Sequence, residues 1–150
     1  MTDVTLTVDK NKVYDEVAKT TSYTGAKMQG DDKAYERIFT TDEDQQMLER
    51  FWTEASNAAT EQFKPFLESN LSDSSCYKVQ LELSSSFETQ LQASIETSLF
   101  SFFVSVIVGK WYKFTNKSET DSYGKEAVGM IEDVMQKIYF KKKPKRVIPQ

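Results

Sequence analysis

The sequence predicts a mainly α-helical protein with a small β element. Long segments repeat apolar residues every three or four positions, and two short segments alternate apolar with polar residues. We therefore expect a helical bundle of about four helices with one two-stranded ribbon, made by residues 4–8 and 77–84. At 150 residues the chain has the usual size of one domain. We expect a single domain over residues 1–150, with an extended basic C-terminal tail from about 143–150.

The strand predictions are based on strict alternation. Val4, Leu6 and Val8 alternate with threonines. Within residues 77–83, the apolar residues Tyr77, Val79, Leu81 and Leu83 alternate with polar ones. A two-stranded ribbon is only marginally stable alone, so a helix is expected to pack on it.

Two helices are predicted between these strands. Residues 13–18 carry one apolar face of a short helix, and residues 20–32, which include two glycines, are typical of a loop or a broken helix. A longer helix is expected from Asp42 to about Ser69, with Thr40 or Thr41 as its N-cap and Pro65 bending or ending its last turn. Residues 70–75 are then expected to form a polar loop.

Two more helices follow the second strand. Ser85 and Glu88 have the spacing of a capping box, which would open a helix from about Ser86 to Phe114. A polar turn at residues 115–118 separates it from a final helix over about 121–142. One apolar stripe runs along that helix: Tyr123, Ala127, Ile131, Val134, Met135 and Ile138.

The residue inventory argues against an enzyme. The chain has no histidine, which removes the commonest general base and transition-metal ligand, and one cysteine, Cys76. Gly25 to Gly30 has the span of a phosphate loop, but Asp31 and Asp32 stand where Lys and Ser or Thr are required. We expect no catalytic, cofactor or metal site.

Charge is divided unevenly between the two halves of the chain. Residues 1–75 carry fifteen acidic and eight basic residues, whereas residues 76–150 carry eight acidic and eleven basic. The acidic half of one molecule could therefore attract the basic half of a neighbour. The most apolar window, residues 99–108, is shorter than the 20 or so residues of a membrane-spanning helix, so we expect a soluble protein that does not bind a membrane.

A stripe of small residues follows the predicted helix over 86–114. Its members recur at spacings of three and four, which lets another backbone approach closely: Ser94, Ser98, Ser101, Ser105 and Gly109. Two alternatives are open. The stripe either packs inside the core of one chain, or it forms a self-assembly interface with a neighbouring subunit.

The C-terminal tail combines positive charge with two prolines and a short apolar pair. Its candidate docking residues are Lys141, Lys142, Lys143, Lys145, Arg146, Val147 and Ile148. Lysines at a helix C-terminus can simply stay solvated. The alternatives are that the extended segment docks on a partner protein, or that it contacts DNA phosphates without sequence specificity.

Residues 87–146 resemble the helical-hairpin end of phage head–tail connector (adaptor) proteins. The resemblance is carried by Phe102-Phe103-Val104, Trp111 to Phe114, Tyr123 to Ala127 and Lys142-Lys143-Pro144: an aromatic helix end, a short turn, a Tyr-containing helix and a basic tail.

The resemblance implies a homo-oligomeric ring in the neck of a virion, assembled in the bacterial cytoplasm. Its C-terminal tail would reach a portal-like protein, its opposite face would receive the tail proteins, and DNA would pass through its channel without sequence readout. The competing expectation is a monomeric or dimeric accessory factor of a phage or mobile element that binds one protein.

Overall fold

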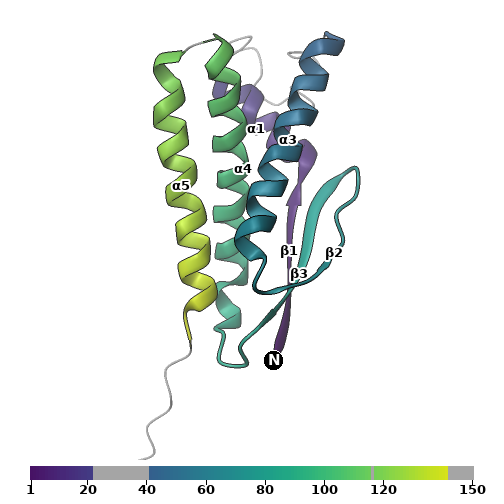
Figure 1. The fold of residues 1–150 in the computed structure, drawn as a ribbon, viewed down its shortest axis with the longest axis vertical. Helices are drawn as coiled ribbons and strands as arrows, with labels where there is room; N and C mark the ends of the chain where they lie inside the picture. The colour runs from purple at the N-terminus through teal and green to yellow at the C-terminus, as the bar shows by residue number, and fades with distance from the viewer. Residues whose placement is uncertain (22–40, 116, 142–150) are drawn as a thin grey trace, which may run out of the picture.

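A computed structural model describes residues 1–21, 41–115 and 117–141, without the side chains of residues 114, 115, 117 and 119 (Figure 1). It confirms a mainly α-helical fold with a small β element. In chain order the elements are β1 (Thr2–Asp9), α1 (Lys10–Thr21), α3 (Asp42–Phe63), β2 (Leu67–Asn70), β3 (Cys76–Leu83), the 3-10 turn η2 (Thr89–Leu91), α4 (Gln92–Thr115) and α5 (Lys117–Tyr139).

The sheet has three antiparallel strands in the order β1-β3-β2, rather than the two predicted. The predicted pairing of residues 4–8 with 77–84 is confirmed, with Val4 opposite Leu81 and Leu6 opposite Val79. These side chains are buried on one face of the sheet, as the alternation requires. The added strand is β2, which pairs with β3 on its other side.

The prediction of a helix up to Ser69 was wrong because Pro65 ends it earlier. Helix α3 stops at Phe63, since proline has no backbone N–H and its ring clashes with the preceding turn. The next residues turn back, and the Phe66 carbonyl accepts a 2.8 Å hydrogen bond from Glu82 N of β3. At the other end Thr41 is the N-cap, and its hydroxyl accepts a 3.0 Å bond from Asp44 N, as predicted. Thr40 lies outside the described residues.

The start of α4 also differs from the prediction. Ser85 does not cap it; instead the Glu88 carboxylate accepts a 3.2 Å hydrogen bond from Gln90 N and opens η2, which leads into α4. The expected polar turn at 115–118 is shorter, because α5 begins at Lys117. Of the expected loop over residues 20–32, Thr20 and Thr21 belong to α1, and the remainder lies outside the described residues.

Helix α4 is the central element of the fold. In Figure 1 it stands between α5 on one side and the sheet with α3 on the other. Towards the sheet, the Phe103 ring lies 4.8 Å from Trp52 of α3 and 5.1 Å from Tyr77 of β3, measured between ring centroids. This aromatic contact joins three elements in one continuous core of buried apolar residues.

Helix α4 also covers the free edge of β1. The Gln92 side-chain amide donates a 2.8 Å hydrogen bond to the Thr5 carbonyl, and Glu96 accepts a 3.0 Å bond from Thr7 N. Gln92 and Glu96 lie one helical turn apart on the same face of α4. They therefore reach the backbone groups of Thr5 and Thr7, which lie two residues apart on the edge of β1. They occupy backbone groups that would otherwise be open to another strand.

Lys10 and Tyr14 of α1 both contact α3. The Lys10 ammonium forms an ion pair with Glu49, and its side chain is only 11% exposed. It also lies 5.7 Å from the centroid of the Tyr14 ring and 5.9 Å from that of Trp52. The Tyr14 hydroxyl donates a 2.9 Å hydrogen bond to the same Glu49 carboxylate.

Replacing Lys10 by methionine should therefore lower the free energy of unfolding by about 1–2 kcal/mol, because a charged hydrogen bond and two cation–π contacts are lost while the alkyl chain is retained. Chemical denaturation measures this. The matched control is Lys12→Met, at an exposed position of the same helix. Equal stability of the two variants would contradict the role of Lys10.

Candidate functional site

The small-residue stripe of α4 faces α5 of the same chain. Ser105 is 3% exposed, and Gly109 lies so close to α5 that a Cβ added there would be 3.3 Å from Tyr123 Cβ. Ser101 is half-buried beside a hollow that Tyr123 also lines. Ser105 and Gly109 therefore take part in intrachain packing, whereas an interface with a neighbouring subunit stays a prediction.

A hydrogen-bonded network extends the same contact towards the start of α4. The Ser98 hydroxyl lies 2.7 Å from Asp133 Oδ2 of α5, and Lys137 Nζ donates to Ser94 Oγ at 2.7 Å and to Ser98 Oγ at 3.3 Å. The Lys137 ammonium, followed by the Ser98 hydroxyl, lowers the pKa of Asp133. Ser94 and Ser98 thus form polar contacts across the helix pair.

The opposite flank of α5 borders a groove, which we call the α3–α5 groove. Its larger hollow, of about 660 Å³, lies between Gln62 of α3 and a row of α5 residues that includes Val128, Met135 and Tyr139. A second hollow, of about 350 Å³, adjoins it and shares Val128 and Ile131. The Phe66 ring packs edge-on against Tyr139 near the end of α5, with 5.3 Å between ring centroids.

Several apolar side chains that line the larger hollow are exposed to water. Val128 is 55% exposed, Tyr139 58% and Phe140 50%. Only two other large apolar side chains are exposed among the described residues, Met1 and Leu71. Exposed apolar area is therefore concentrated here, which is typical of a surface that binds another molecule.

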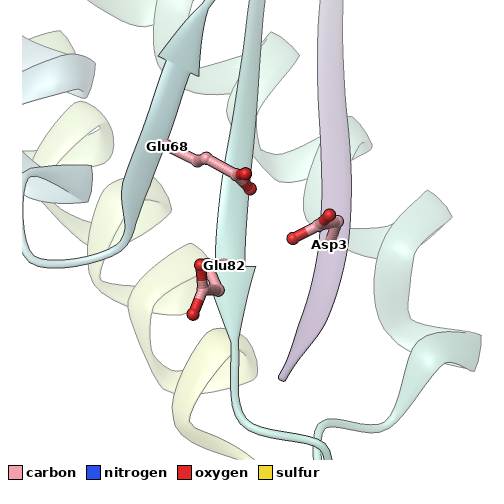
Figure 2. A group of neighbouring side chains, drawn as sticks. All are labelled: Asp3, Glu68 and Glu82. Atoms are coloured by element: carbon pink, nitrogen blue, oxygen red, sulfur yellow. The ribbon is translucent and has the colours of Figure 1, made fainter.

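Three acidic side chains gather on the outer face of the sheet: Asp3 of β1, Glu68 of β2 and Glu82 of β3 (Figure 2). Asp3 and Glu82 are directly opposite in the strand register. Glu68 joins them because β2 has a bulge between Leu67 and Ser69, and its side chain extends over β3 towards Asp3.

The group has carboxylate oxygens within 4.8 Å of one another. Asp3 raises the pKa of Glu68 by sharing a hydrogen bond with it and by charge repulsion, and Glu82 adds to the repulsion. All three residues are exposed, and calcium sites use six to eight oxygen ligands. We assign no metal to this cluster, and interpret it as a strained, charged patch on a short sheet.

The C-terminal docking candidates fall almost wholly beyond the described residues. Lys142, Lys143, Lys145, Arg146, Val147 and Ile148 all lie outside them. Lys141 is exposed, and its backbone forms an antiparallel bridge with Phe87. Lys141 is thereby fixed beside the segment that leads into α4.

The apolar character of α4 exceeds the ten-residue window taken from the sequence. Residues Thr89–Lys113 are long and apolar enough to cross a membrane by length and composition, with a mean hydropathy of 1.6 over the most apolar 18-residue window. In the structure 44% of that window is buried. Its position between the sheet and α5 accounts for apolar residues on both sides of the helix.

Sequence reasoning missed both the α3–α5 groove and the acidic cluster. The groove had a signal: Val128 and Tyr139 are apolar residues of α5 outside the predicted core stripe, and they lie at spacings of seven and four from Met135 of that stripe. The cluster had none, because Glu68 was assigned to a helix.

Comparisons with known proteins found no matching family model, no matching curated protein and no matching solved structure.

Two glycines test the close contact between α4 and α5. Replacing a helical glycine by alanine usually stabilises by about 0.5–1 kcal/mol. Gly124→Ala should show that gain, because a Cβ there would meet nothing within 4 Å. Gly109→Ala should not, since its Cβ would press on Tyr123 Cβ. Thermal denaturation of both variants decides; an equal gain would show that the helices do not approach closely at Gly109.

The acidic cluster generates a pH-dependent prediction. Because the folded state raises the pKa of Glu68, ionising this group costs stability as the pH rises through that value. Glu68→Gln should therefore raise the melting temperature at pH 7, and the difference from the natural chain should disappear below pH 4.5, the usual pKa of glutamate. Glu132→Gln, an exposed change on α5, is the control. A gain that does not depend on pH would contradict the interpretation.

Proposed function

We propose that this chain is a structural assembly protein that joins copies of itself through the α3–α5 groove. The observation that carries the proposal is the exposed apolar surface of Val128, Tyr139 and Phe140 around the larger hollow. A surface of this kind is stabilised when a partner removes it from water.

The occupant that we propose is a second copy of the chain. The basic excess of residues 76–150 lies in the C-terminal tail, in Lys142, Lys143, Lys145 and Arg146, whereas the half of the sequence that contains α3 has an acidic excess. Near the groove Lys113 is exposed, and in the first turn of α3 Asp42 and Glu43 are exposed. Contact between the basic half of one copy and the acidic half of the next is heterologous, and such contacts produce a ring when the rotation closes.

The specific form of the proposal is a ring connector between a portal-like protein and a tail, located in the neck of a virion. It rests on the resemblance of residues 87–146 to head–tail connectors. The absence of histidine from the sequence agrees with a structural rather than a catalytic role. Docking of residues 143–150 on the portal-like partner stays a prediction, as does passage of DNA through the ring.

The alternative is an accessory factor that binds one other protein as a monomer or dimer. The same exposed apolar surface supports it, because the groove would then receive a helix of that protein. Mass in solution separates the two functions.

We expect native mass spectrometry and light scattering to find a closed oligomer of more than two copies that dissociates as salt is raised, because salt screens the complementary charges. Val128→Lys should lower the mass to that of the monomer without lowering the melting temperature, since Val128 is mostly exposed. The control is Ser122→Lys, which adds the same charge to α5 at an exposed position that lines neither hollow. A monomer or dimer at every concentration and salt would contradict the ring and favour the alternative.

A further inference from the structure

The smaller hollow of the α3–α5 groove has the composition of a ligand pocket. Its floor is α4, with Phe102, Val106 and Gly109, and its walls are α5 and Ala58 of α3. Its volume of about 350 Å³ lies within the range of small-molecule sites, which are largely apolar with a few polar groups that orient the ligand.

Glycines make this space available. Gly109 brings α4 and α5 together at one end, while Gly124 leaves the wall open, because a Cβ there would meet nothing within 4 Å. Gly124 lines the hollow, and a side chain at this position would have open space around its Cβ.

The polar groups of the pocket favour a negatively charged head group. Lys110 and Lys113 both line it. Lys110 forms a 3.0 Å ion pair with Glu54, whereas Lys113 is exposed and has no ion pair among the described residues. Among the described residues, one positive charge at the pocket is therefore not neutralised.

We infer that this pocket binds a small amphipathic carboxylate, with its alkyl or aryl body between Phe102, Val106 and Val128 and its carboxylate towards Lys113. Each chain carries the whole pocket, but the pocket shares Val128 and Lys113 with the proposed contact between copies, so a ligand and a neighbouring copy compete for this surface.

The test uses sodium decanoate, below its micelle concentration, as the probe for titration calorimetry and for amide shifts in NMR. Decanoate should bind at one site per chain and shift the Gly124 amide more than that of Gly129. Gly124→Leu should weaken binding about tenfold or more, because leucine occupies the pocket. Gly129→Leu is the matched control: it also lies on α5 with open space around its Cβ, but it does not line the pocket.

The head group is tested separately. Lys113→Gln should weaken decanoate by about tenfold and leave the neutral alcohol decanol within about twofold, since only the charged ligand loses an ion pair. Lys125→Gln, at an exposed lysine of α5 outside the pocket, should change neither.

Absence of decanoate binding, or equal binding by the Gly124→Leu and Gly129→Leu variants, would overturn the inference. Equal weakening of decanoate and decanol by Lys113→Gln would overturn the carboxylate assignment. Melting temperatures of the two leucine variants should agree, which shows that lost binding is not lost folding. The mass in solution is measured in the same samples, so failure of the pocket is distinguished from failure of the ring.

Discussion

The close approach of α4 and α5 is the constraint on which the rest of the structure depends. Helix α5 has its extensive contacts with α4 alone, through Ser98, Ser105 and Gly109 on the α4 side. Small side chains at this contact let the two backbones approach, and burial of Ile131, Val134 and Ile138 stabilises the pair. Larger side chains on α4 would push α5 away and expose that stripe to water.

This arrangement also explains why a groove exists. Because α5 is attached through one face, its flank towards α3 is left exposed at Val128, and Phe66, which follows α3, contacts Tyr139 near the end of α5. On the α4 side, Ser105 and Gly109 are small and leave part of the space unfilled. The groove is thus a consequence of the same contact that holds α5, and the proposed functions depend on it.

Much of the fold could be predicted from local sequence patterns. Alternation located β1 and β3, Thr41 located the start of α3, and the apolar stripe on α5 identified the residues that are buried there. What local patterns could not provide was β2. Its four residues have no alternation of large apolar side chains, and they form a strand only because Pro65 ends α3 beside the edge of β3.

The same limit applies to the candidate site. The small-residue stripe was recognised in the sequence, but the helix that packs on it was not. Small residues are needed whether that helix belongs to the same chain or to a second copy. The acidic cluster depends on a bulge in β2 and on strand register, which are tertiary features. Exposure of Val128 could not be separated from burial of Ile131, one turn away, without knowing where α3 lies.

Native-state hydrogen exchange tests the central position of α4 most directly. Amides in the middle of α4, from Phe102 to Val108, are buried between the sheet and α5, so they should exchange only when the whole molecule unfolds. Their opening free energy should equal the free energy of global unfolding obtained by denaturation. If these amides instead exchange through a local opening, at a lower free energy than those of α1 or α3, α4 is not the element that organises the fold.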